Sequence, residues 1–233
     1  LSDHYIPYFS QAQTFTELHI EQGPRLENTH QSIGLVKGIV AQQRFTVTVS
    51  GLANHAGTTP MNNREDAVEE GCRLINKIYQ LAHHNDPNLL LTIGRLIVTP
   101  NVSNVIANQV QFSIDIRHHV DLQLEQFVSQ LLKLVTLQQN TTIINVLRVP
   151  STLLSPPMLK MHQEQTQRLG LSYLPLFSGA GHDSQIISQV TPTAMIFVPS
   201  QHGISHRPDE STVLQDLVTG TRLLAASLHA QAY

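Results

Sequence analysis

The segment Gly51–Met61 places one histidine, His55, among small and turn-forming residues. It follows the stretch 44–50, where apolar and polar residues alternate as in a strand with one buried face. A strand that ends in such a loop can hold an imidazole at a fixed point of the surface, where it can polarise a carbonyl group. The competing interpretation is a turn whose exposed histidine has no chemical role.

Two more segments place histidines directly after apolar strands. One is Glu17–Gly23 (Glu-Leu-His-Ile-Glu-Gln-Gly), which contains His19, and the other is Pro199–Pro208, which contains His202 and His206. Ligand sites gather at strand ends along the edge of an α/β sheet. Imidazole is a ligand for Zn, Mn, Co or Ni, but two histidines so far apart in sequence do not by themselves specify a metal site.

The stretch 103–117 predicts a strand whose polar face ends in Arg117. Its planar guanidinium suits a carboxylate ligand, and the alternative is a surface arginine paired with Asp115. A glycine-rich turn, Ser178–Ser184 (Ser-Gly-Ala-Gly-His-Asp-Ser), precedes a predicted helix. Its backbone N–H groups could meet an anion or a carbonyl.

The middle of the chain predicts the order β-α-β-β-α-β, which is that of a ferredoxin-like sandwich with both helices on one face of an antiparallel sheet. The expected elements are strands at 44–50, 89–98, 105–117 and 142–149, a helix from about Asn63 to Ala82, and a helix over 124–135.

The flanks of this unit predict α/β alternation, with strands at 14–20 and 193–198 and helices at 158–169, 183–189 and 212–229. The extended stretch 33–40, with Gly34 and Gly38, is interpreted as a hinge between domains. We therefore expect one domain inserted in another. Residues 1–38 and 150–233 form the outer α/β domain, and residues 39–149 form the inserted one.

The composition excludes several classes of protein. Only 14 Lys and Arg and a formal net charge of −3 argue against nucleic-acid binding. The sequence contains no apolar run of membrane-spanning length. A single cysteine, Cys72, precludes an internal disulfide framework and favours a reducing, cytoplasmic location. Because Cys72 lies in an amphipathic pattern, it is expected to be a small buried residue.

The motifs named above resemble the amidohydrolase branch of the M20 metallopeptidase superfamily. That branch contains allantoate amidohydrolases, N-carbamoyl-L-amino-acid hydrolases and related ureido-acid hydrolases. The similarity extends over essentially the whole chain, with the motifs in the right order. It implies an α/β fold in which part of a two-metal peptidase-like catalytic domain carries an inserted ferredoxin-like α+β lid, through which two copies form a homodimer.

The resemblance also implies roles for individual residues. Metal ligands are His19 for one ion and His206, rather than His202, for the other. Residues that contact the ureido-acid substrate are Gln22, His55, Asn104, Arg117 and Gly181. Of these, Arg117 holds the substrate carboxylate with help from Asn104, and His55, from the partner's lid, stabilises the tetrahedral oxyanion. His182 and Asp183 are expected to support the site without taking part in the chemistry.

The family's His-x-Asp ligand pair, bridging Asp and Glu-Glu pair with the general base all precede the segment that matches His19. None is found in residues 1–18, and the chain begins with Leu1 instead of methionine. We therefore expect the C-terminal part of an enzyme, inactive by itself. The two divalent ions of the intact enzyme are not expected to stay bound to it.

The expected activity of that enzyme is hydrolysis of a C–N bond, other than a peptide bond, in a ureido acid. Allantoate, N-carbamoyl amino acids and 3-ureidopropionate remain open as substrates. The alternatives are an aminoacylase or dipeptidase of the same superfamily, and a non-catalytic dimerisation module.

Overall fold

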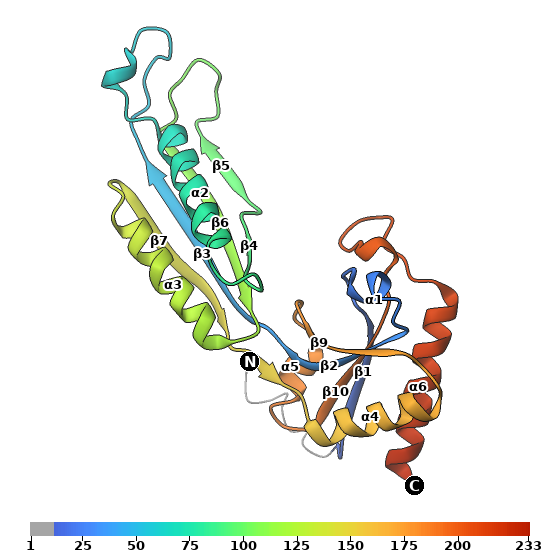
Figure 1. Ribbon diagram of the computed structural model, residues 1–233. Coiled ribbons are helices and arrows are strands. Elements are labelled where there is room, and N and C mark those ends of the chain that lie inside the picture. Colours follow the sequence, from blue (N-terminus) through green and yellow to red (C-terminus); the bar gives the residue numbers. More distant parts are fainter. Residues whose placement is uncertain (1–11) are drawn as a thin grey trace. The chain divides into compact units, whose positions relative to one another are not determined.

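The computed structural model describes residues 12–233, which divide into two compact units. The α/β unit contains the described residues up to Val40 together with Thr152–Tyr233, and the sandwich unit is Ala41–Ser151 (Figure 1). The boundaries expected from the sequence fall two residues before each of these junctions. The predicted α/β class of the fold is confirmed, with one sheet in each unit.

The sandwich unit is an antiparallel sheet whose two helices lie on one face (Figure 1). Its strand order is β4-β6-β3-β7, with β5 also beside β6. The elements are β3 (Ala41–Ser50), α2 (Ala67–His83), β4 (Leu90–Thr92), β5 (Leu96–Thr99), β6 (Gln109–His118), α3 (Asp121–Thr136) and β7 (Thr141–Val149). The short 3₁₀ helix η2 (Met61–Asn63) precedes α2. The single strand expected at 89–98 is two short strands, β4 and β5.

Strand alternation builds the core of the sandwich unit. Phe45, Val47 and Val49 of β3 are buried, and they share one cluster with Ile78 of α2 and Phe127 of α3. Thr46 and Thr48 of the same strand lie on the opposite face of the sheet, because successive side chains of a strand point to opposite faces.

The expectation that Cys72 is buried is wrong. It is exposed on α2, whereas Gly71 and Leu74 of the same helix are buried. The helix turns 100° per residue, so residues adjacent to a buried position can face solvent.

The α/β unit contains a mixed five-stranded sheet of order β1-β10-β2-β8, with β9 also beside β2. Its strands are β1 (Phe15–Ile20), β2 (Ile33–Ile39), β8 (Thr152–Leu153), β9 (Tyr173–Ser178) and β10 (Thr193–Val198). β1 is parallel to β10, with His19 beside Phe197. β2 pairs with β10, β9 and β8 and is almost wholly buried. The stretch expected to be a hinge is thus a central strand, and β9 lies between the helices expected at 158–169 and 183–189.

Helices cover both faces of this sheet. On one face, α4 (Pro156–Arg168) and α6 (Leu214–Ala232) pack on a cluster that includes Leu35, Ile196 and Leu223. The second cluster contains Leu26 of α1 (Arg25–Asn28) and Phe197 of β10. The remaining elements are α5 (Asp183–Ile187), which contacts β1 and β10, and the 3₁₀ helix η3 (Gln201–Gly203). No helix in the described part of the chain combines the length and the apolar character needed to cross a membrane.

Candidate metal and substrate site

Strand β1 places Glu17 and His19 on one face of the α/β sheet, because residues two apart in a strand point the same way. The other face of β1 carries Leu18 and Ile20, which pack into the core beneath α4 and α6. Since β1 and β10 are parallel, their carboxyl ends meet at one edge of the sheet. The loops that follow them contain Gln22 on one side and His202 and His206 on the other.

The imidazole of His19 is oriented by its own backbone neighbour. Its Nδ1 lies 2.9 Å from the carbonyl oxygen of Ile20. A carbonyl oxygen only accepts, so Nδ1 must carry the hydrogen and Nε2 presents a lone pair. Such a bond to the second ring nitrogen is typical of histidines that bind metal ions through the other one.

Glu17 is held ionised beside this histidine. Its Oε2 accepts hydrogen bonds from the backbone N–H and the hydroxyl of Ser184, at 3.0 and 2.6 Å, and its Oε1 lies 3.7 Å from Nδ1 of His182. Burial alone would raise the pKa of the carboxyl, but the bonds from His182 and Ser184 outweigh it and lower the pKa to about 2. Glu17 is therefore a carboxylate at every ordinary pH.

His182 joins this carboxylate to the glycine-rich turn. Its side chain is only 4% exposed, and its Nε2 lies 2.8 Å from the hydroxyl oxygen of Ser178. That hydroxyl donates to the carbonyl oxygen of Ala180 at 3.0 Å, so Nε2 of His182 must be the donor in the bond between them. The ring also meets that of His19 edge-on, with centroids 4.8 Å apart.

Together, Glu17, His19 and His182 offer ligand atoms that all lie within 4.8 Å of one another, a spacing at which three residues can hold a metal ion. This is the one such cluster in the described part of the chain. Of these three residues, His19 was expected from the sequence as a ligand and His182 as a supporting residue, whereas Glu17 was not expected. The signal for Glu17 was its place two residues before His19 in a strand.

The loops after β1 and β10 lie against each other. Gln22 donates from its backbone N–H to Oγ of Ser200 at 3.0 Å and from its side-chain amide to Oγ of Ser205 at 3.1 Å. Gly203 has a φ of +63°, and a Cβ there would lie 2.7 Å from the nitrogen of Pro24, so only glycine permits this approach. The contacts bring Ser205, the residue before His206, to the side chain of Gln22.

Gln22 and His206 both adopt left-handed backbone angles, with φ of +56° and +60°. Non-glycine residues adopt this region at a cost, and they cluster at functional sites. His206 is exposed, its backbone N–H donates to Glu210 at 3.2 Å, and it is not part of the cluster around His19. Gly181 is exposed in the turn between β9 and α5, where a Cβ would meet only the side-chain oxygen of Gln185 at 3.6 Å.

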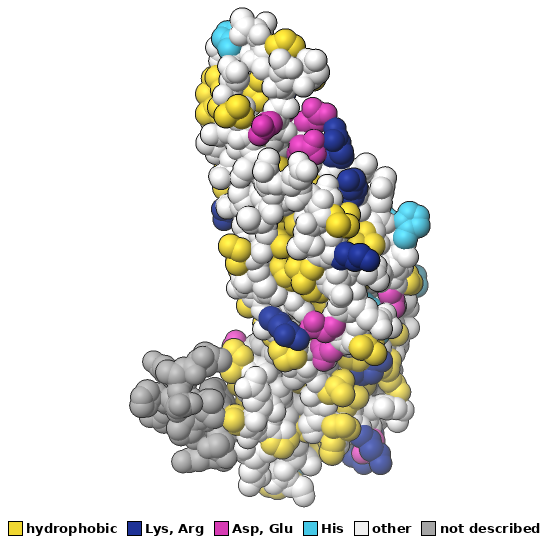
Figure 2. Space-filling model, turned by 90° about the vertical axis from the view of Figure 1, so that its left-hand side faces the viewer, with side chains coloured by type: hydrophobic (Ala, Val, Ile, Leu, Met, Phe, Trp, Pro, Cys, Tyr) yellow, Lys and Arg dark blue, Asp and Glu magenta, His cyan; other side chains and the backbone are white. Residues whose placement is uncertain are grey.

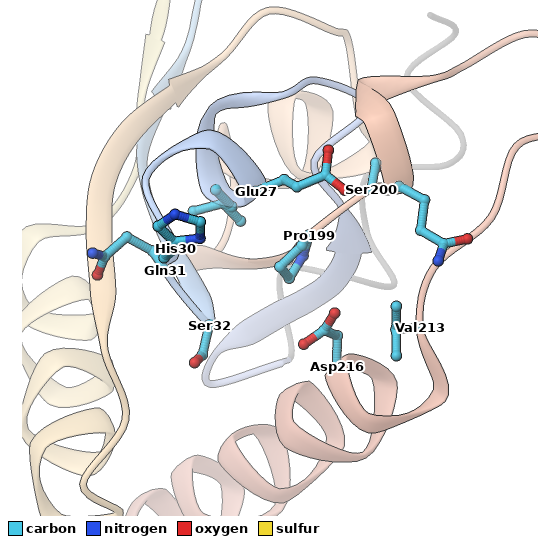
Figure 3. A pocket seen from close by; sticks show the side chains of 10 residues that line it. Glu27, His30, Gln31, Ser32, Pro199, Ser200, Val213 and Asp216 are labelled. Atoms are coloured by element: carbon cyan, nitrogen blue, oxygen red, sulfur yellow. The ribbon is translucent and has the colours of Figure 1, made fainter.

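A separate hollow of about 270 Å³ lies between the α1 segment and the start of α6 (Figure 3). Its lining includes Glu27, His30, Pro199, Ser200 and Asp216. Burial raises the pKa of Asp216 above its usual range. None of the residues predicted to bind metal or substrate lines this hollow.

In the sandwich unit, His55 and Asn104 lie at the same end of the sheet. The backbone N–H of Ala56 donates to the carbonyl oxygen of Asn104 at 3.0 Å, and both predicted residues are exposed. Gly57 donates its N–H to Nδ1 of His55 at 3.0 Å. Nδ1 is thus an acceptor, and Nε2 carries a hydrogen that it can donate to a ligand.

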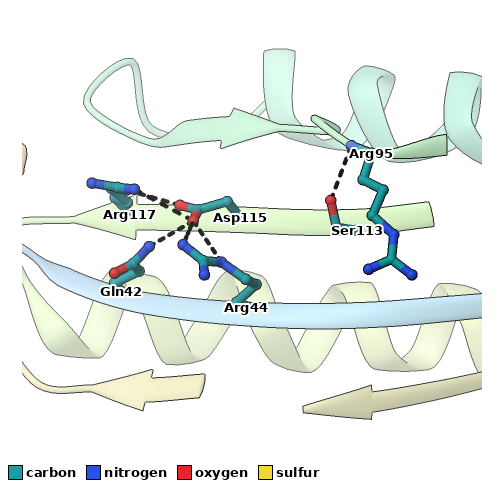
Figure 4. A network of polar contacts seen from close by, with 6 residues as sticks. All are labelled: Gln42, Arg44, Arg95, Ser113, Asp115 and Arg117. Carbon is teal, nitrogen blue, oxygen red and sulfur yellow. Dashed lines mark hydrogen bonds and ion pairs between the residues drawn. The ribbon is translucent and has the colours of Figure 1, made fainter. Parts of the chain in front are cut away.

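Arg117 is partly buried near the other end of β6, where it is paired with Asp115 (Figure 4). Its Nε lies 2.8 Å from Oδ1, and Arg44 contacts Oδ2 of the same carboxylate at 2.8 Å. Burial raises the pKa of Asp115, but the bonds from Arg117 and Arg44 outweigh it and bring the pKa below its usual range. The pairing that the sequence analysis left as the alternative is therefore present.

The strand register separates Arg117 from His55 and Asn104. Arg117 pairs with Gln42 at the start of β3, whereas Gln109 pairs with Ser50 at the end of β3 that leads to the His55 loop. Eight residues of β-strand span about 26 Å, at roughly 3.3 Å per residue. Within one chain, Asn104 accompanies His55, and the expected help from Asn104 to Arg117 is not possible there.

Comparison with known proteins identifies the class. Residues 5–230 match the model of peptidase family M20/M25/M40, and the chain belongs to this family. The resemblance found in the sequence is thereby confirmed.

Relatives within the family place the chain near its amidohydrolases. It is 38% identical to an allantoate amidohydrolase of Bacillus subtilis over 97% of the chain, and 34% identical to an N-carbamoyl-L-amino-acid amidohydrolase of Paenarthrobacter aurescens over 94%. A crystal structure of an amidase of the hydantoinase/carbamoylase family from Burkholderia vietnamiensis superposes with a TM-score of 0.87 at 30% identity, over 94% of this chain and 55% of that one. The chain spans about half the length of the curated relatives it matches, 56% and 54% of these two.

Proposed function

We propose that this chain is part of a metal-dependent amidohydrolase that hydrolyses a C–N bond of a ureido acid, such as allantoate or an N-carbamoyl amino acid. The observation that carries the proposal is the 38% identity to an allantoate amidohydrolase across 97% of the chain. The cluster of Glu17, His19 and His182 supports it, since it stands at a sheet edge of the kind where ligand sites form.

In this proposal, the α/β unit holds the metal side of the site. His19, with Nε2 open, and His206 are ligands for two divalent ions, and imidazole suits Zn, Mn, Co or Ni. Such ions lower the pKa of water and polarise a carbonyl group. Gln22 and Gly181 would contact the substrate, because Gln22 is fixed beside the loop of His206 and Gly181 is exposed in the turn next to His182.

The sandwich unit acts as the lid. Arg117 would bind the substrate carboxylate through its planar guanidinium. His55 would donate from Nε2 to the carbonyl oxygen as negative charge develops there. Asn104, on the loop next to His55, would bind the substrate from the same side.

The strand register supports a homodimer through the lid. A small ureido acid is far shorter than the distance between Arg117 and His55 in one chain, so we assign the two to different copies at each site. The edge strands of the lid sheet, β7 on one side and β4 and β5 on the other, support this assembly. Exposed apolar residues include Leu96, Ile97, Ile144 and Val146 on these strands, and Figure 2 shows hydrophobic side chains at the surface of the unit. Unpaired strand edges favour association.

The experiment is a substrate panel. In the longer protein that the proposal implies, ammonia release is measured with allantoate, N-carbamoyl-L-amino acids and 3-ureidopropionate, after chelation and again after Zn, Mn, Co or Ni is added. N-acetyl amino acids and dipeptides test the aminoacylase or dipeptidase alternative. Turnover of ureido acids that is lost on chelation supports the proposal. Turnover of N-acetyl amino acids or dipeptides alone overturns it.

Cytoplasmic location, which the single cysteine favours, is part of the same proposal.

A further inference from the structure

The contacts around Glu17 form a continuous network from β1 to the glycine-rich turn. Ser184 donates twice to the carboxylate of Glu17, the carboxylate faces Nδ1 of His182, and Nε2 of His182 donates to Ser178. Ser178 in turn donates to the carbonyl oxygen of Ala180 and accepts from its N–H, at 3.0 and 3.1 Å. We call this set of contacts the Glu17–His182 network.

Two neighbouring features depend on this network. The ring of His182 is packed edge-on against the ring of His19 and also lies 5.5 Å from Phe197, so it restricts the rotation of His19. The bonds through Ser178 fix the backbone at Ala180, next to Gly181. One set of contacts therefore controls both a proposed metal ligand and a proposed substrate contact.

The bonding argues against Glu17 and His182 being ligands themselves. Oε2 of Glu17 already accepts two hydrogen bonds, and Nε2 of His182 is engaged with Ser178. The atoms left over, Nδ1 of His182 and Oε1 of Glu17, face each other at 3.7 Å inside the network. His19 differs, because its Nδ1 is bonded to the Ile20 carbonyl and no contact of the network involves its Nε2.

We propose that Glu17 and His182 are positioning residues, which hold the His19 imidazole with Nε2 toward the metal site and fix the 179–181 turn beside it. This inference rests on the proposed function for the importance of His19 and Gly181, but its structural content concerns this chain alone. It assigns a role to a carboxylate and a buried histidine that take no part in the chemistry.

The test uses the uniformly ¹⁵N-labelled 233-residue chain and NMR at one fixed neutral pH. Long-range ¹H–¹⁵N correlations identify which ring nitrogen of His19 carries the hydrogen. In the wild-type chain we expect hydrogen on Nδ1 alone. In Glu17→Gln and His182→Gln we expect averaged ring signals for His19 and amide exchange at Ala180 that is about tenfold faster, the effect of losing one hydrogen bond of typical strength.

Matched controls separate positioning from general loosening. Glu21→Gln removes a carboxylate that accepts from the N–H groups of Arg25 and Leu26 but belongs to no contact of the network. His162→Gln removes another buried histidine, which bonds to Ser227 on α6. Both controls should leave the His19 signals and the Ala180 exchange unchanged.

Milder variants keep the test decisive if Glu17→Gln or His182→Gln fails to fold. Ser178→Ala and Ser184→Ala each remove one hydroxyl from the network and should produce the same changes to a smaller extent.

Unchanged His19 signals in every folded network variant, or equal changes in the controls, would overturn the inference. So would a ring ¹⁵N shift on addition of Zn²⁺ that shows Nδ1 of His182 bound to the ion, because His182 would then be a ligand. Absence of ureido-acid turnover in the longer protein, with the NMR result as expected, would refute only the proposed function.

Discussion

At the scale of single residues, the tautomers set by backbone contacts determine what each histidine can do. His19 donates from Nδ1 to Ile20 and keeps Nε2 as a lone pair, whereas His55 accepts at Nδ1 and keeps Nε2–H as a donor. A lone pair suits a metal ion, and a donor suits a developing oxyanion. One local hydrogen bond thus gives each histidine the tautomer that its proposed role requires.

Arg117→Lys should impair substrate binding much more than folding. Lysine keeps the charge but loses the two-pronged geometry, a loss of about 1.5–3 kcal/mol for a charge-assisted contact, which raises KM roughly 10- to 100-fold. Steady-state kinetics of the longer protein, with chemical denaturation as the check on folding, measure both effects.

The control for this variant is Arg44→Lys. Arg44 contacts the same Asp115 carboxylate, but we assign it no contact with substrate. If KM and kcat for Arg117→Lys equal those of the wild type, or if both variants raise KM equally, Arg117 does not bind the substrate carboxylate.

At the scale of elements, the α/β unit depends on close contacts between α6 and the strands beneath it. Gly220 of α6 is buried, and a Cβ there would lie 2.5 Å from a methyl carbon of Val198 and 2.9 Å from one of Leu18. The glycine lowers the intrinsic helix propensity, but it allows the helix to approach β1 and β10.

Gly220→Ala should therefore destabilise the chain, although alanine is the better helix former. The propensity gain is about 1 kcal/mol, and overpacking against buried side chains costs about 1–3 kcal/mol. Urea denaturation followed by circular dichroism gives the change, with Thr221→Ala, at an exposed position of the same helix, as the control. A more stable Gly220→Ala chain would mean that α6 lies farther from the sheet than described.

His162 of α4 links three elements and makes stability depend on pH. It is fully buried, and its ring nitrogens contact Ser227 of α6 at 2.8 Å and Thr16 of β1 at 3.4 Å. Burial lowers its pKa from 6.5 to about 4. Between these values the unfolded chain binds the proton that the folded chain excludes.

The stability that His162 contributes is thus present above pH 6.5 and is lost as the pH falls to about 4. The loss approaches 3 kcal/mol, at about 1.4 kcal/mol per pKa unit. The measurement is the unfolding free energy at a series of pH values, and His162→Gln should flatten its slope in this window. Equal slopes for the variant and the wild type would show that other groups cause the pH dependence.

At the scale of the whole molecule, the proposal concerns assembly through the lid sheet. Arg117 lies near one end of β6, and His55 and Asn104 lie beyond the other, so a site that uses all three needs two copies. We expect a dimer in light scattering at micromolar concentration, and a strictly monomeric particle would count against the lid interface.

Complementation provides a sharper test of the shared site. In the longer protein, His55→Ala and Arg117→Ala should each be nearly inactive alone. When the two are mixed and allowed to exchange subunits, one site per heterodimer regains both residues, so activity should reappear. The control is Arg117→Ala mixed with itself, which should stay inactive. If activity does not recover although the subunits have exchanged, His55 and Arg117 act within the same chain.

The metal content of the isolated chain is a further expected outcome at this scale. Tight binding requires three or four convergent ligands, whereas each of the two proposed ions has one proposed ligand from this chain, His19 for one and His206 for the other. Elemental analysis of the dialysed chain should therefore find no stoichiometric Zn, Mn, Co or Ni. One or more ions per chain would show that a fuller set of ligands is present.

The sequence alone determined most elements and the two sheets, because periodicity reflects which face of an element is buried. β10 occupies the predicted residues 193–198, and the bounds of β3, α3 and β7 lie within a few residues of the predicted bounds. α2 begins at Ala67 and not near Asn63, since Asp66 caps it by accepting from Val68 and Glu69. Short motifs also pointed to His19, His55 and Arg117 as candidates, because the chemistry of a side chain is local.

Only the tertiary structure decided which of these residues meet. Glu17 joins His182 through contacts between segments 165 residues apart, which no periodicity encodes. The partnership of β2 with β10, β9 and β8 made a buried strand of an expected hinge, because pairing depends on distant segments. The register of β3 and β6 likewise separated Arg117 from His55. Sequence specifies the local chemistry of each residue, and packing between distant segments specifies its neighbours.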